Sequence, residues 1–221
     1  LFLLGREPED LERSARDLEA RAGSASGSVA VAACDLLAPE SFAPALDAAE
    51  TALGGLDAVV VTAGLFATQD ALEGDPELAR RLLEANFSGT VLFCEAARRR
   101  LLARGGGRLC VFSSVAGERG RKPVVLYGAA KAGLTRYLEG LDHRFRARGL
   151  VVTTVKPGFV RTSMTDGLPA PPFAGDPDPV ARRVLRAFDR GVPVVYAPWP
   201  WRWVMMIVRH LPRFVMRRVG F

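Results

Sequence analysis

The chain has 221 residues, of which 49% are hydrophobic and 24% are charged, and its formal net charge is +6. This composition excludes a disordered protein, and the length suits one large domain with its own core. Three cysteines without metal-like spacing and only two histidines argue against a disulfide framework and a histidine metal site.

The excess positive charge is concentrated at one end of the chain. Residues 199–221 contain five arginines and no acidic residue, which leaves 25 basic (30 minus 5) and 24 acidic residues in the remainder. A general nucleic-acid-binding surface would not be confined in this way, so we expect no nucleic-acid partner. Buried thiols in a reducing compartment favour a cytoplasmic protein.

Apolar runs alternate with helical periodicities along the chain. In chain order the pattern predicts a strand at Leu1–Leu4, a helix at Glu7–Ala22, a strand at Val29–Ala33, a helix at Pro39–Leu53, a strand at Asp57–Thr62, a helix at Pro76–Ala103 stopped by Gly105–Gly107, a strand at Arg108–Ser113, a helix at Tyr127–Arg148, a strand at Leu150–Val155, a helix at Val180–Asp189 and a strand at Pro193–Ala197. Apolar strands separated by helices indicate an α/β fold with a parallel sheet covered on both faces. Ligands bind such sheets at the carboxyl ends of the strands.

A serine, a tyrosine and a lysine follow the fourth predicted strand. Tyr127 and Lys131 are four residues apart, so on a helix they share one face, about 6 Å apart. A phenol, with a reference pKa near ~10, transfers protons poorly at neutral pH unless a cation stabilises the phenolate. Lys131 could supply that cation, and Ser114 could hold a substrate oxygen against Tyr127. The alternative is a half-exposed tyrosine beside a solvated lysine.

Several short motifs, in this order, resemble those of the short-chain dehydrogenases/reductases, and the resemblance covers essentially the whole chain. They are T-A-G at 62–64, which is similar to the family's N-A-G, E-A-N-F-S-G-T around Asn86, S-S-V-A-G…Y-G-A-A-K-A-G at 113–133, and K-P-G-F-V-R-T at 156–162. The resemblance implies a Rossmann-like doubly wound parallel sheet in three layers. It also implies an NAD(P)-dependent oxidoreductase that transfers hydride to or from a carbonyl or secondary alcohol. A catalytically silent structural or membrane-associated subunit is the alternative.

The same resemblance assigns roles to individual residues. Tyr127 would be the general acid/base, and Lys131 would lower its pKa and bind the nicotinamide ribose. Ser114 would orient the substrate oxygen, and Asn86 would support a water that relays protons. Further cofactor contacts are expected at Ala63, Gly64, Pro157, Gly158, Val160 and Thr162, although Thr162 could instead be an ordinary loop hydroxyl.

Two residues at the ends of the first strands bear on the cofactor. Asp35 matches the family's acid that contacts the adenine, but it could equally cap a helix. Gly5 stands where an NAD enzyme usually has an acid for the ribose hydroxyls, and Arg6 follows it. Because an arginine accommodates a 2′-phosphate, NADP(H) is favoured over NAD(H). A solvated Arg6 is the alternative.

The resemblance also expects a strand, a Gly-rich turn and a helix before Leu1. That strand would be central, between Leu1–Leu4 and Asp57–Thr62. The expected fold is therefore a Rossmann-like sheet without its first strand and helix, in residues 1–198 of a chain that we expect to be a fragment of a longer one. Such a piece should bind a dinucleotide poorly.

Residues 199–221 are predicted to form a basic amphipathic helix kinked at Pro212. On a helical wheel the basic face holds Arg202, Arg209, Arg213 and Arg217, and the apolar face holds Trp203, Val204, Ile207, Val208, Leu211, Phe214 and Val215. Its apolar length is too short to span a bilayer. It could form a subunit interface in a homo-oligomer, a flap over the active site, or a peripheral contact with an anionic membrane.

The substrate is expected to be a small carbonyl or alcohol. Within the family, the motifs at 113–121 and 156–164 and the tail are similar to reductases of decaprenylphosphoryl-2-keto-erythro-pentose, which implies a keto sugar on a lipid carrier. The proline-rich segment Gly167–Pro179 lies where the family has its substrate loop.

Overall fold

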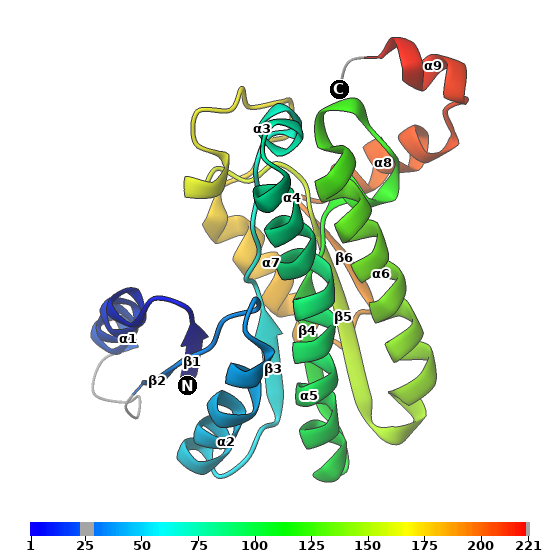
Figure 1. The fold of residues 1–221 in the computed structure, drawn as a ribbon. Helices are drawn as coiled ribbons and strands as arrows, with labels where there is room; N and C mark the ends of the chain where they lie inside the picture. Colours follow the sequence, from blue (N-terminus) through cyan, green and yellow to red (C-terminus); the bar gives the residue numbers. More distant parts are fainter. Residues whose placement is uncertain (23–28, 220–221) are drawn as a thin grey trace.

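The computed structural model describes residues 1–22 and 29–219, which form parallel strands and helices (Figure 1). In chain order the elements are β1 (Phe2–Gly5), α1 (Pro8–Ala22), β2 (Ala30–Ala33), α2 (Phe42–Leu53), β3 (Ala58–Val61), α3 (Gln69–Gly74), α4 (Pro76–Leu83), α5 (Thr90–Ala103), β4 (Gly107–Phe112), α6 (Val125–Phe145), β5 (Leu150–Pro157), α7 (Pro177–Asp189), β6 (Val194–Ala197), α8 (Trp201–His210) and α9 (Arg213–Arg218). Every strand pair is parallel, which confirms the predicted α/β class.

The strands form two separate ladders. Backbone hydrogen bonds join β1 to β2, and they join β3, β4, β5 and β6 in that order, but no ladder joins β1 to β3 among the described residues. Figure 1 shows β1 and β2 beside β3, at the edge of the larger sheet. Val60 on β3 is 52% exposed although a valine in a parallel sheet is normally buried. The interruption falls where the family resemblance implies a central strand that would precede Leu1.

Helices cover both faces of the four-stranded sheet. The larger core packs α2, α5 and α6 on one face, with Leu109, Val111 and Val152 among its fully buried strand residues. On the other face α7 packs Val180 and Val184 against the remaining strand side chains. This arrangement leaves the carboxyl ends of the strands open to ligands.

The predicted helix Pro76–Ala103 is not continuous, and the prediction was wrong on this point. The helix is divided into α4 and α5 by a wider π-helical turn at Glu84–Gly89. The Thr90 hydroxyl donates to the Ala85 carbonyl, five residues earlier, at 2.6 Å. The extra residue turns Asn86 inward, where it is fully buried, and π turns of this kind often mark functional sites. The structure also has α3, which the sequence analysis missed.

The C-terminal segment forms two short helices, α8 and α9, separated at Pro212 as predicted. The predicted apolar face is divided, however. Its Val204 and Val208 pack with Met205 on Val115 and Tyr196, while its Trp203 and Ile207 lie exposed. Residues 220–221 of the predicted helix lie outside the described residues. Within the described ranges, none of the helices has the length and apolar character that a bilayer span requires.

Candidate active site

A cavity of about 800 Å³ lies at the carboxyl ends of β3, β4 and β5. Nine of the residues predicted from the sequence line it: Gly64, Asn86, Ser114, Tyr127, Lys131, Pro157, Gly158, Val160 and Thr162. They come from four separate parts of the chain. The structure therefore brings together every predicted catalytic residue and most of the predicted cofactor contacts.

Asn86 fixes the loop that leaves β3. Its Oδ1 accepts from the Leu65 backbone N–H at 3.1 Å, and its Nδ2 donates to the Leu65 carbonyl at 2.6 Å. A Cβ at Gly64 would lie 2.7 Å from Asn86 Oδ1 and 3.5 Å from Lys131 Nζ. Glycine at 64 is therefore needed for this loop to approach the Asn86 amide so closely, and the lysine amine lies next to it.

The two serines after β4 have different partners. The Ser113 hydroxyl donates to the Lys131 carbonyl at 2.9 Å and contacts the Thr135 hydroxyl at 2.7 Å, so it ties β4 to α6. Ser114 caps the following 3₁₀ turn, where its hydroxyl accepts from the Ala116 N–H at 3.1 Å. Ser114 also lines the cavity.

Glycines hold the 3₁₀ turn (Val115–Glu118) directly against α6. A Cβ at Gly117 would lie 2.7 Å from backbone atoms of Lys131 and Ala132, and one at Gly128 would lie 2.9 Å from the Ala116 carbonyl oxygen. Backbones this close admit no side chain between them. The small residues around Tyr127 thus set the position of Ser114 relative to the helix.

Tyr127 and Lys131 lie one turn apart on α6, as predicted, and Lys131 Nζ is 5.8 Å from the centre of the Tyr127 ring. Burial raises the pKa of Tyr127, and the Ser114 side chain acts in the opposite direction. Lys131 Nζ donates to the Phe112 carbonyl at 3.0 Å, and burial lowers the pKa of this amine to about 8. The Tyr127 ring also packs edge-on against Phe66, at 5.2 Å between ring centres.

The C-terminal segment contributes to the cavity wall. Trp201, at the start of α8, lines the cavity, and a Cβ at Gly158 would lie only 2.2 Å from its indole. The indole N–H donates to the Phe173 carbonyl at 3.1 Å. Trp201 therefore joins the segment after β5 to the predicted substrate loop. In the sequence Trp201 is one tryptophan of an aromatic run, and nothing in that run indicates that it packs on Gly158.

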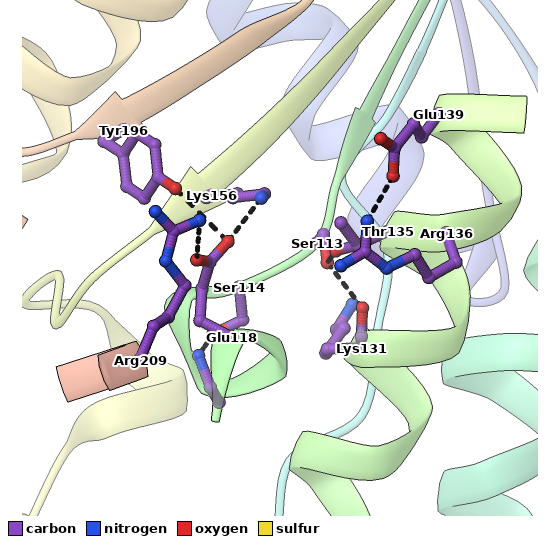
Figure 2. A network of polar contacts seen from close by, with 11 residues as sticks. Ser113, Ser114, Glu118, Lys131, Thr135, Arg136, Glu139, Lys156, Tyr196 and Arg209 are labelled. Carbon is purple, nitrogen blue, oxygen red and sulfur yellow. Dashed lines mark hydrogen bonds and ion pairs between the residues drawn. The ribbon is translucent and has the colours of Figure 1, made fainter. Parts of the chain in front are cut away.

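A buried carboxylate ends the 3₁₀ turn that follows Ser114. Figure 2 shows the Glu118 carboxylate between Lys156, Tyr196 and Arg209. Glu118 makes an ion pair with Lys156, accepts from the Tyr196 hydroxyl at 3.2 Å, and lies 3.4 Å from Arg209. The Glu118 side chain is only 5% exposed. Arg209 was predicted to lie on the basic face of the tail, but the tertiary structure pairs it with Glu118.

Arg6, Asp35 and Ala63 do not line the cavity. The Arg6 guanidinium makes an exposed ion pair with Glu7 at 2.8 Å. Asp35 Oδ1 accepts from the Leu37 N–H at 2.9 Å, which forms a local turn. Asp35 does not cap a helix, because Ala38 is the N-cap of the helical turn that follows, Pro39–Ser41. Thr162 lines the cavity and also takes part in a capping box with Thr165.

Comparison with known proteins identifies the family. The family model described as short chain dehydrogenase matches residues 1–171. The chain belongs to the short-chain dehydrogenase family. An uncharacterized oxidoreductase of Streptomyces coelicolor is 34% identical and covers 99% of this chain and 85% of its own length. Another from Mycobacterium tuberculosis is 34% identical over 75% of this chain and 67% of its own length.

Solved structures share the fold of this short-chain dehydrogenase. A short-chain type dehydrogenase/reductase from Mycobacterium ulcerans superposes with a TM-score of 0.78 at 23% identity, covering 88% of this chain and 78% of its own. By its family match and its curated relatives, the chain is an oxidoreductase enzyme of this family, which implies a nicotinamide cofactor and a small-molecule substrate. These relatives favour the enzyme over the catalytically silent alternative.

The cavity fits the nicotinamide end of such a cofactor. Gly64 and the buried amine of Lys131 line the cavity side by side, and this amine is a suitable donor to ribose hydroxyls. Within the described ranges, no group of three or more histidine, cysteine or acidic side chains is arranged to hold a metal ion.

Proposed function

We propose that this chain is an NADP(H)-dependent carbonyl reductase or secondary-alcohol dehydrogenase in which Tyr127 is the general acid/base. The observation that carries this proposal is the convergence of Asn86, Ser114, Tyr127 and Lys131 on one cavity from separate parts of the chain. The nicotinamide supplies or accepts the hydride when it is bound.

The protein's own residues handle the proton and the substrate oxygen. Burial raises the pKa of Tyr127, so the phenol keeps its proton at neutral pH and is ready to donate it to a carbonyl oxygen. Ser114 lines the same cavity and holds that oxygen by a hydrogen bond. Lys131 binds the nicotinamide ribose and, with its positive charge, favours the phenolate that forms when Tyr127 gives up its proton. Asn86 holds the neighbouring loop and supports the proton-relaying water.

Tyr127→Phe tests this assignment. The variant should lose at least about 10²-fold in kcat, which is the usual contribution of a positioned acid/base. Tyr137→Phe is the matched control, because Tyr137 is on the same helix but donates to Glu95 at 2.8 Å outside the cavity. Nicotinamide fluorescence should show that both variants still bind cofactor. An active Tyr127→Phe variant would refute the role of the phenol.

The preference for NADP(H) is proposed from Arg6 and Gly5. The Arg6 side chain is 55% exposed, and its pair with Glu7 is of the surface kind that contributes little, so a 2′-phosphate could replace the carboxylate. We propose that Asp35 contacts the adenine and that Ala63 lies against the cofactor. Arg6→Ala should raise the dissociation constant of NADPH and leave that of NADH unchanged.

For residues 199–221 we propose a peripheral contact with anionic membrane, appended to a catalytic domain at 1–198. Trp199, Trp203, Ile207 and Phe214 are each at least half exposed on α8, α9 and the segment before them. Arginines accompany them without any acidic residue. Apolar side chains beside cations suit the surface of an anionic bilayer. A lipid-linked keto sugar would be a consistent substrate, and we propose a homo-oligomer as the assembly.

A further inference from the structure

Three cations follow the 3₁₀ turn at Val115–Glu118, and two of them hold the C-terminal segment. Arg119 donates to the Leu211 carbonyl at 2.8 Å, and Lys122 Nζ donates to the Arg217 carbonyl at 2.6 Å. These carbonyls belong to the ends of α8 and α9, where unpaired helix carbonyls attract cations. Arg119 and Lys122 therefore have structural partners.

Arg121 lies between them and has no such partner. Its Nε is buried and makes no hydrogen bond to any residue in the described part of the chain. Among the ion pairs of the described residues, none includes Arg121. Burial lowers the pKa of its guanidinium, with no neighbouring carboxylate acting in the other direction. A buried charged donor without an acceptor is costly, so its presence suggests an acceptor that arrives from outside.

The same arginine lines the active-site cavity together with Ser114 and Tyr127. Asp70 is the one acidic residue in the described lining, against the cations Arg121, Lys122 and Lys131. Lys122 is bonded to the tail, and Lys131 is assigned to the ribose. Arg121 is thus the cation left to meet a substrate.

The rest of the lining is largely apolar. It includes Phe66, Val124, Phe159, Met164, Leu168 and Trp201. An apolar cavity of about 800 Å³ with one convergent cation is typical of a site for an amphiphilic anion.

We propose that Arg121 binds an oxyanion of the substrate, a carboxylate or a phosphate, so that the enzyme prefers carbonyl or alcohol compounds with an apolar body and a negative charge. This inference rests on the proposed function, because the substrate's carbonyl or alcohol group must reach Tyr127 while Arg121 holds its anionic group. The planar guanidinium can offer Nε and a terminal nitrogen to two oxygens of one anion, which an amide cannot match.

Calorimetric titration of the full chain with octanoate and with octanamide tests the proposal. The two probes share an apolar tail and differ in charge, so octanoate should bind at least about tenfold more tightly, as expected of a hydrogen bond to a charged group. Arg121→Gln should abolish this preference, and Arg121→Lys should keep part of it. Arg119→Gln is the matched control, because it removes the same charge from the same loop but outside the cavity. Octyl phosphate in place of octanoate distinguishes a phosphate from a carboxylate site.

Two results would overturn the proposal. Equal affinity for octanoate and octanamide would do so, as would a preference that survives in Arg121→Gln when the melting temperature shows a folded variant. NADPH titration of the same variants separates a cofactor phosphate from a substrate anion, since a loss of NADPH affinity in Arg121→Gln would assign the arginine to the cofactor instead. If Tyr127→Phe keeps its activity while the octanoate preference still depends on Arg121, the proposed function fails and the anion site stands.

Discussion

The indole of Trp201 occupies the space that a side chain at position 158 would need, because a Cβ on Gly158 would lie 2.2 Å from its Cδ1 and Nε1 atoms. The segment expected to contact the nicotinamide is therefore built against the first residue of the C-terminal helix α8. The position of this segment and the position of the tail are coupled at this point.

Gly158→Ala should lower the free energy of unfolding by about 1–3 kcal/mol, the usual cost of overpacking. Trp201→Leu in the same chain should recover part of this loss, because the smaller side chain leaves room for the new methyl group. Urea denaturation of the two single variants and the double variant measures the coupling. Gly140→Ala on α6 is the control, since its Cβ meets nothing within 4 Å, and it should be neutral or stabilising. Additive losses in the double variant would contradict the contact.

Lys131 should make stability depend on pH. Burial lowers the pKa of this amine from 10.5 to about 8, so between these values the unfolded chain binds more protons than the folded one. The free energy of unfolding should therefore rise with pH across this window, by up to about 3 kcal/mol. Below the folded-state pKa, the buried amine is protonated and destabilises the fold by this full amount. Lys131→Met should flatten this rise in urea denaturation curves. Equal slopes in the variant and the parent would show that the amine is not desolvated.

Glu118→Gln should destabilise the protein strongly. The substitution keeps the shape of the side chain but leaves the cations of Lys156 and Arg209 without their carboxylate in a buried place. A loss of about 3 kcal/mol in the free energy of unfolding is expected when one partner of a buried pair is removed. Glu139→Gln, which breaks the exposed pair with Arg136, should cost less than about 1 kcal/mol. Similar losses in the two variants would mean that the buried network contributes no more than a surface pair.

The exposed face of the tail should bind anionic vesicles. Replacing Arg202, Arg213 and Arg217 by Glu should weaken binding to phosphatidylglycerol-containing vesicles by about tenfold or more, because each arginine contributes to attraction by the anionic surface. Arg209 is left intact because it pairs with Glu118. The double variant Trp203→Ser/Ile207→Ser should also weaken vesicle binding, because it removes apolar contacts with the bilayer and leaves the charge of the tail unchanged.

Arg13→Glu, on the exposed side of α1, is the control for general charge. Binding that persists in the tail variants would refute the membrane contact. A fall in molar mass in light scattering would instead show that this face joins subunits.

The sequence by itself determined the α/β class, the order of the strands, most of the helices, and the segment that contains each of Asn86, Ser114, Tyr127 and Lys131. These predictions depend on local periodicity, on i and i+4 spacing and on the order in which the family's motifs occur. All of these can be recognised from the sequence of a single chain. The short-range pattern also gave the boundaries of the apolar strands to within two residues.

Tertiary structure decided the rest, because a side chain's partner is set by packing between segments distant in sequence. Arg202 and Arg209 look alike in the tail, yet only Arg209 meets Glu118, which is 91 residues earlier in the chain. Arg119, Arg121 and Lys122 look like one basic run, but the helix ends of the tail take two of them and leave Arg121 at the cavity. No periodicity distinguishes such residues, since the difference arises only when the surrounding elements exclude water from one of them and not from its neighbours.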